Sequence, residues 1–198
     1  MEFLGKSFQL IYRGANLKEG DHQHKTPLIA AILYKNPDIL SYFTREVYTD
    51  KMKDLSSMVD VDMKNIIHFA ILSRDNLIIS SVLDWLEPHR GLLSSLLRGK
   101  DYKGNTPLHL AAQLGRLEDL TQRFVSLHSS QDLLLGNDLH QTSYHVAAKS
   151  GSLKMLKVLH ARDEKEEDLT LIHKKDIDQN SPLHLAAINT VLLRPPEG

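Results

Sequence analysis

The stretch Asp101–Gly115, DYKGNTPLHLAAQLG, decides the fold because it recurs along the chain. Four further windows align with it on His109, and three of them again carry a histidine at this position. The aligned positions follow one another at intervals of 36 to 41 residues, and an alanine stands two residues after each. They are Ile29, His68, His109, His145 and His184, followed by Ala31, Ala70, Ala111, Ala147 and Ala186. Five copies at this spacing indicate a chain built from structural repeats.

Other positions of the alignment, which we call columns, also carry similar residues in every copy. They predict where each repeat starts a helix and where it turns. Three residues before the aligned position stands an N-cap residue, Thr26, Asn65, Thr106, Thr142 or Ser181, and prolines 27, 107 and 182 then suit the first helical position. The repeated alanine indicates that another backbone packs too closely for a larger side chain. A tight turn between short extended segments is predicted eight residues before the aligned position, at Asp21, Asp60, Asp101, Asn137 and Asp176.

These motifs resemble the ankyrin repeat, which has a period of about 33 residues, a β-turn and two helices. The resemblance rests on TPLHLAA at Thr106–Ala112 and SPLHLAA at Ser181–Ala187. It implies an all-α ankyrin-repeat solenoid, in which helix-turn-helix repeats are joined by short β-hairpin loops. We expect one domain over 1–198, with partial repeats at 1–20 and 176–198 and complete repeats at about 21–59, 60–100, 101–136 and 137–175. Phe3–Tyr12 would be an outer helix without its inner partner, so the chain is expected to be a fragment of a larger protein.

The copies depart from the family pattern in three ways. They are longer, so elongated outer helices or extra helical turns are expected in 45–58, 87–100, 126–137 and 161–175. The glycine between the two helices is kept only at Gly115 and Gly151; Lys35 and Arg74 replace it. Asn36 and Asp75 follow these residues, and because Asn and Asp tolerate a left-handed backbone, we expect the turn to survive. The second copy has lost both its proline and its turn glycine, so its hairpin is expected to depart most from the family pattern.

Composition excludes several classes of function. The chain has 198 residues, is 41% hydrophobic and carries a formal net charge of −1, so no basic field would attract nucleic acid. It contains no cysteine, which excludes disulfides, a thiol nucleophile and thiolate metal sites. No apolar run approaches the roughly 18 residues of a membrane span, and the N-terminus lacks a signal-peptide pattern. We expect an intracellular, cytoplasmic protein without direct membrane insertion; the nucleus stays open as a location.

No motif for catalysis, a cofactor or a metal stands out, and we expect no enzyme activity. The resemblance makes the histidines of the repeat column structural. His22 and His24 lack a third ligand for zinc and are expected at a solvated hairpin tip. Trp85 is expected to pack along an outer helix, with an exposed partner anchor as the alternative. Arg162–Asp168 is expected to be a solvated loop or helix end, with an electrostatic docking patch as the alternative.

The resemblance implies protein binding through the concave face, which consists of hairpin tips and the exposed sides of the inner helices. Three other roles stay open: the cytosolic domain of a membrane channel, the substrate-recruiting arm of an enzyme, and part of a secreted bacterial effector. End-to-end self-association through the terminal half-repeats is a further expectation. The candidate partner-binding residues are Tyr34, Tyr102, Lys103, Asn105, Gln113, Leu114, Asp138, Leu139, Gln141, Lys149, Ile177 and Asp178.

Overall fold

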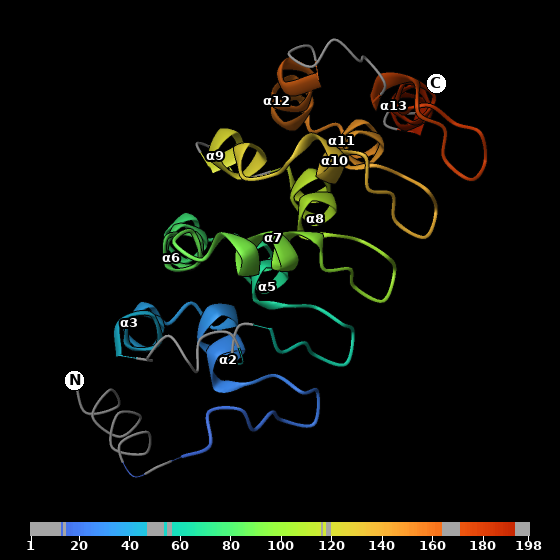
Figure 1. The fold of residues 1–198 in the computed structure, drawn as a ribbon. Coiled ribbons are helices and arrows are strands. Elements are labelled where there is room, and N and C mark those ends of the chain that lie inside the picture. Colours follow the sequence, from blue (N-terminus) through green and yellow to red (C-terminus); the bar gives the residue numbers. More distant parts are fainter. Residues whose placement is uncertain are drawn as a thin grey trace, which may run out of the picture. The chain divides into compact units, whose positions relative to one another are not determined.

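The computed structural model describes residues 13, 15–46, 54, 57–115, 117, 120–163 and 171–192. The chain divides into two compact units, residues 1–102 and 103–198. Within the described ranges the regular structure is entirely helical, with eleven α-helices and one short 3-10 helix and no assigned strand. In each unit, inner helices stack on one another, outer helices cover one side of them, and hairpin loops project on the other (Figure 1). The predicted outer helix Phe3–Tyr12 lies outside the described residues.

The first unit contains two helix pairs and an additional helix. The inner helices α2 (Pro27–Leu33) and α5 (Ile66–Ser73) pack on each other, and each contacts its outer helix, α3 (Pro37–Glu46) or α6 (Asn76–Leu86). Phe43 is fully buried between these layers, as are Leu28, Ile67 and Val82. Complete burial of such a side chain contributes about 2–3 kcal/mol.

The second unit repeats the arrangement with three inner helices. Here α11 (Ser143–Ser150) packs between α8 (Pro107–Leu114) and α13 (Pro182–Leu192), while the outer helices α9 (Leu120–Ser126) and α12 (Leu153–Asp163) contact each other. The repeated alanines Ala111 and Ala147 are completely buried. The hydroxyl of Ser150 donates to the Ala112 carbonyl at 2.8 Å, which shows how closely the backbones of α8 and α11 approach. This close approach agrees with the small residue that the repeat keeps in the neighbouring alanine column.

In the second, third and fourth copies the surplus residues include extra helical turns, as expected. The helix α7 (Arg90–Arg98) packs against α5 and α6, and α10 (Ser130–Leu133) and the 3-10 helix η2 (Leu171–His173) follow the outer helices of the second unit. Leu93, Leu96 and Leu97 are the buried face of α7. Most of 45–58 and residues 164–170 lie outside the described residues.

The predicted N-caps are confirmed. The Thr26 hydroxyl accepts from the Ile29 amide at 3.4 Å, and the Asn65 carboxamide oxygen accepts from the Ile67 amide at 3.0 Å. Thr106 and Thr142 form capping boxes in which the histidine three residues later completes the pair. Each such cap satisfies backbone donors that the first helical turn leaves unpaired.

The turn between inner and outer helices also survives without glycine, although the mechanism expected from the sequence is wrong. Lys35 and Arg74 themselves adopt the left-handed conformation, with φ of 52° and 55°. Asn36 and Asp75 instead cap the next helix: Asn36 accepts from the Ile39 amide at 3.1 Å, and Asp75 accepts from two amides at its helix start. Gly115 and Gly151 occupy the same left-handed position in the second unit, with φ of 62° and 70°.

Candidate functional site

The hairpin tips are fixed by the aspartate or asparagine that starts each turn. In the second repeat, one Asp60 carboxylate oxygen accepts from the amides of Asp62 at 3.0 Å and Lys64 at 2.8 Å. The Asn137 side-chain oxygen holds the amides of Leu139 and Gln141 at 3.0 Å in the same way. The hairpin of the second copy therefore has the same bonding as those that start at Asp21, Asn137 and Asp176, and the expectation that it would depart most from the family pattern is wrong.

One residue of every turn has a left-handed backbone, yet only one of the five is a glycine. Gly104 has a φ of 72°, and the other four are His24, Met63, His140 and Gln179, with φ between 56° and 63°. A Cβ atom at Gly104 would lie 2.3 Å from a carboxylate oxygen of Asp138. Close approach of the next hairpin therefore requires glycine at this turn, while the other turns accept a side chain at some conformational cost.

Adjacent hairpins of the second unit are joined through their backbones. The Asp138 amide donates to the Lys103 carbonyl at 3.2 Å, and the Ile177 amide donates to the Leu139 carbonyl at 3.0 Å. The Gln141 carboxamide adds a bond to a carboxylate oxygen of Asp176 at 3.2 Å. The tips of this unit are thus a row of pre-organised segments.

The carboxylate of Asp176 shows the electrostatic effect of this bonding. Burial alone would raise its pKa, but hydrogen bonds from Asn180, Gln141 and Asp178 together hold the pKa below its usual range. Hydrogen bonds to the ionised form favour it over the protonated acid. Asp176 therefore stabilises its turn as a carboxylate.

Two of the repeat-column histidines, His109 and His145, join successive repeats. Nδ1 of His109 accepts from the Thr106 amide at 3.2 Å, so the proton is on Nε2, which donates to the Gln141 carbonyl at 2.8 Å. His145 does the same, with Nε2 3.2 Å from the carbonyl oxygen of Asn180. Burial lowers the pKa of His145, which keeps its ring neutral.

In the second unit most of the candidate binding residues are exposed. Leu139 and Ile177 are 49% and 53% exposed on neighbouring hairpins, surrounded by charged residues. Leu114 and Asn105 are half-buried, and the Asn105 carboxamide oxygen accepts from Asn137 at 2.9 Å. The exposed polar candidates of this unit are Lys103, Gln113, Asp138, Lys149 and Asp178.

Gln141 is a correction to the predicted set. It is only 7% exposed, and its side chain is bonded to Asp176 of the next hairpin. It holds two turns together and offers no surface to a partner. The sequence places it beside exposed turn residues, but its burial depends on a hairpin 35 residues further along the chain.

In the first unit the two tyrosine candidates are exposed, and two apolar neighbours were missed. Tyr34 is 84% and Tyr102 56% exposed. Lys64 lies with its ammonium nitrogen 5.5 Å from the centre of the Tyr102 ring and 2.6 Å from a carboxylate oxygen of Asp62. Val61 and Met63, each 54% exposed, lie on the same tips. Val61 is in the same column as Tyr102, so the register of the repeat could have identified it.

Comparison with protein families decides the assignment. Residues 103–138 match the family model of the ankyrin repeat, and this span includes a hairpin, α8, α9 and α10. The matched span is an ankyrin repeat, and it supports the assignment of the chain to the ankyrin-repeat family. The all-α solenoid fold class of the chain is thereby confirmed, together with the resemblance carried by TPLHLAA. No curated protein shows detectable similarity to the sequence.

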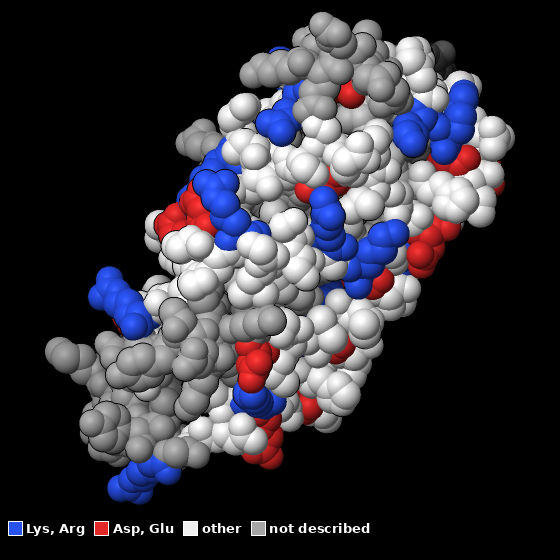
Figure 2. Space-filling model, viewed as in Figure 1, with Lys and Arg blue, Asp and Glu red and all other residues white. Residues whose placement is uncertain are grey.

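Ankyrin repeats are in general protein–protein interaction modules, and the fold is not a catalytic one. In the described part of this ankyrin chain, no three His, Asp or Glu side chains gather where they could hold a metal ion. No helix there is long and apolar enough to span a membrane. Figure 2 shows lysine and arginine interspersed with aspartate and glutamate on the face in view, without a large field of one sign.

The other residues singled out in the sequence have ordinary positions. Trp85 is half-buried on α6, next to the buried Leu86, and this favours a packing role. His22 and His24 are exposed at the first hairpin, as predicted. Of Arg162–Asp168, only the half-buried Arg162 and the buried Asp163 are described, so the docking-patch alternative lies mostly outside the described residues.

Proposed function

We propose that this ankyrin chain binds a protein partner through its hairpin tips and the adjoining sides of its inner helices. The observation that supports this most is the pair Leu139 and Ile177. The backbone bond between their hairpins holds them next to each other, and about half of each side chain is exposed. Exposed aliphatic side chains at the tip of a rigid turn do nothing for folding, but they suit an interface.

Charged residues surround this apolar pair in the second unit. Asp138 and Asp178 are exposed directly beside it, and Lys103 and Lys149 add positive charge on the hairpins and on α11. An apolar centre with a polar rim of both signs is typical of non-obligate protein interfaces. The partner surface is therefore proposed to combine an apolar anchor with flanking charges.

The first unit carries a second apolar group with the same position in the repeat. Val61, Met63 and Tyr102 are exposed on its hairpin tips, and Tyr34 is exposed at the end of α2. Tyrosine supplies a large contact area with little loss of side-chain entropy, which is why it is frequent in binding hot spots. Each unit thus offers a binding surface of its own.

The proposed role is that of an adaptor or targeting module, which binds by rigid, pre-organised contacts without a chemical step. The proposal places the chain inside the cell, in the cytoplasm, and the absence of cysteine agrees with a reducing compartment.

Affinity capture from a cell lysate tests the proposal. A Leu139→Glu/Ile177→Glu variant places two charges on the hairpin tips. The matched control is Leu77→Glu/Leu153→Glu, which changes two leucines that are 77% and 63% exposed at the starts of the outer helices α6 and α12. Equal helicity and melting temperature of all three proteins are checked first.

A partner that is retained by the wild type and the control but lost by the hairpin variant supports the proposal. Retention by the hairpin variant, combined with loss by the control, would move the site to the outer helices and contradict it. Tyr102→Ala applies the same test to the first unit.

A further inference from the structure

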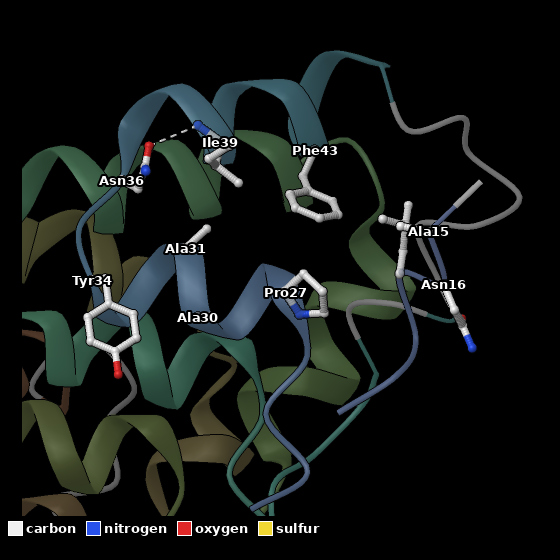
Figure 3. A pocket seen from close by; sticks show the side chains of 10 residues that line it. Ala15, Asn16, Pro27, Ala30, Ala31, Tyr34, Asn36, Ile39 and Phe43 are labelled. Carbon is white, nitrogen blue, oxygen red and sulfur yellow. Dashed lines mark hydrogen bonds between the residues drawn. The ribbon is translucent and has the colours of Figure 1, made fainter. Parts of the chain in front are cut away.

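Two apolar surfaces stand out in the described part of the chain, and only one of them specifies the chemistry of an occupant. The first is a pocket of about 370 Å³ between α2 and α3, in which Phe43 points toward Pro27 (Figure 3). Asn36 lies at its edge, where its side-chain oxygen already caps α3. None of the described lining residues is charged, so the pocket does not indicate which kind of ligand would fill it.

The second surface is the apolar pair Leu139 and Ile177 on the hairpin tips of the second unit. The exposure of this pair is a property of the turn itself. Ile177 is 53% exposed, and Val61, which occupies the same column in the first unit, is 54% exposed although it has a hairpin on either side. The Val61 amide bonds the hairpin before it, and the Asp62 carbonyl bonds the hairpin after it. A neighbouring hairpin therefore does not cover this position.

Two exposed carboxylates flank the apolar pair. Asp138 immediately precedes Leu139, and Asp178 immediately follows Ile177. Neither carboxylate forms an ion pair with any described residue. The hairpins 137–141 and 176–180 contain no lysine or arginine, and Asp176 adds a third, buried carboxylate. The charge next to the pair is therefore negative.

The corresponding carboxylate of the first unit is neutralised within its own turn. Asp62 occupies the same column as Asp178, and its carboxylate oxygen lies 2.6 Å from the ammonium nitrogen of Lys64. Asn180 stands in the place of Lys64, and both its amide and its side chain bond to Asp176. The hairpin of the second unit therefore contains no counterion for Asp178.

The lysines closest in the chain do not supply this counterion. Lys103 lies on the preceding hairpin, where its carbonyl accepts from the Asp138 amide, so it offsets part of the charge of Asp138 only. The lysines at 174–175 precede the second hairpin, and the carbonyl of Lys174 faces the buried ring of His145 at the base of that hairpin. The unbalanced negative charge is therefore greatest at Asp178.

We propose that Leu139 and Ile177 bind a basic segment of a protein partner, in which an aliphatic or aromatic side chain is flanked by lysine or arginine. Because the same surface carries the proposed function, this partner chemistry depends on it. The apolar side chain covers the pair, and a cation beside it approaches Asp178, as in an interface with an apolar centre and a charged rim. Opposite charges at such a rim select the partner and speed its association more than they add affinity.

Peptide display tests this chemistry without a known partner. A phage-displayed library of random dodecapeptides is panned against the whole chain of residues 1–198 and against its variants. Leu139→Ser/Ile177→Ser removes the apolar pair without adding charge. Asp138→Lys/Asp178→Lys reverses both flanking charges and keeps the pair.

The matched control for charge reversal is Glu19→Lys/Asp38→Lys. It makes the same change in net charge at two exposed positions of the first unit. Circular dichroism and melting confirm that every variant folds like the wild type.

Peptides enriched on the wild type and on the control are expected to carry an excess of lysine and arginine next to an aliphatic or aromatic residue. In fluorescence anisotropy, these peptides should bind the charge-reversed variant about tenfold more weakly and should lose affinity as salt rises from about 50 to 500 mM. The charge-reversed variant should enrich acidic peptides instead. Asp178→Asn should weaken binding more than Asp138→Asn, because Lys103 lies beside Asp138 only.

Failure of this partner chemistry can be told apart from failure of the proposed function. Peptides that need Leu139 and Ile177 but show no excess of basic residues, or that bind the charge-reversed variant equally well, would overturn the basic partner and leave the proposed function standing. Peptides that bind Leu139→Ser/Ile177→Ser as tightly as the wild type would contradict both, because binding would then lie elsewhere. A library in which no peptide is enriched would also contradict both.

Discussion

Nε2 of His109 lies 2.8 Å from the carbonyl oxygen of Gln141, 32 residues further along the chain. The same imidazole accepts from the Thr106 amide through Nδ1. One side chain therefore caps its own helix and anchors the next hairpin. This double role explains the recurrence of histidine in the repeat without any need for metal binding or catalysis.

Replacement of this histidine is expected to destabilise the protein. His109→Leu leaves the Thr106 amide without its acceptor and removes the bond to Gln141, so the free energy of unfolding should fall by about 2–3 kcal/mol. Urea denaturation followed by circular dichroism measures the change. His184→Leu is the control: this histidine is exposed and bonds Ser181 of its own cap, so a loss of about 1 kcal/mol or less is expected. Equal losses for the two variants would contradict the bridging role.

Two glycines provide a matched pair for the hairpin geometry. Gly104→Ala puts a Cβ atom 2.3 Å from a carboxylate oxygen of Asp138, at a φ of 72°, and is expected to cost about 2 kcal/mol or more. Gly91→Ala, in α7, meets no atom within 4 Å and should stabilise by up to about 1 kcal/mol. Thermal melting of both variants gives the comparison, and a stabilising Gly104→Ala would mean that the turn does not require glycine.

The left-handed arginine between α5 and α6 predicts a stabilising substitution. Arg74 is exposed with a φ of 55°, so Arg74→Gly should relieve strain and raise the free energy of unfolding by up to about 1 kcal/mol. Lys157→Gly, at an exposed position inside α12, should instead cost about 1 kcal/mol. The same sign for both changes would show that backbone conformation is not the deciding factor.

A buried histidine of the second unit makes stability depend on pH. His128 is 2% exposed; Nδ1 donates to the Phe124 carbonyl at 2.9 Å, and Nε2 has no hydrogen-bond partner in the described structure. Burial lowers the pKa of His128, although the bond to Phe124 and the nearby Asp132 oppose the shift. The His128 imidazole is therefore protonated near pH 6.5 in the unfolded chain, whereas in the folded chain it takes up a proton only at lower pH.

Stability from this histidine is fully present above pH 6.5 and is lost as the pH falls from there toward the lower pKa of the folded state. For one such group, the free energy of unfolding can change by about 1.4 kcal/mol per pH unit. Burial also lowers the pKa of His145, so this histidine acts in the same direction. Denaturation curves recorded at several pH values between about 7 and 5 give the free energy of unfolding at each pH. This free energy should depend less steeply on pH for His128→Leu than for the wild type. His22→Gln, at an exposed hairpin residue, should leave the slope unchanged.

The sequence by itself determined the repeat, the N-caps and the Asp or Asn turns, because each depends on residues within four positions of one another. Thr106 caps its helix and Asn137 closes its hairpin through such local bonds, so their columns predict the structure directly. The family and the all-α fold follow from the same columns. The extra helical turns were predicted from repeat length, but not the faces on which they pack.

Tertiary structure alone decided which residues of similar local sequence are exposed. Gln141 has the composition of a solvated turn and is buried, because Asp176 reaches it from a hairpin 35 residues away. Leu108 and Leu183 occupy the same column, yet one is 1% and the other 77% exposed, because α11 packs on the first and none of the described helices packs on the second. Burial is set by neighbours one repeat away, and a local pattern contains no information about whether such a neighbour is present.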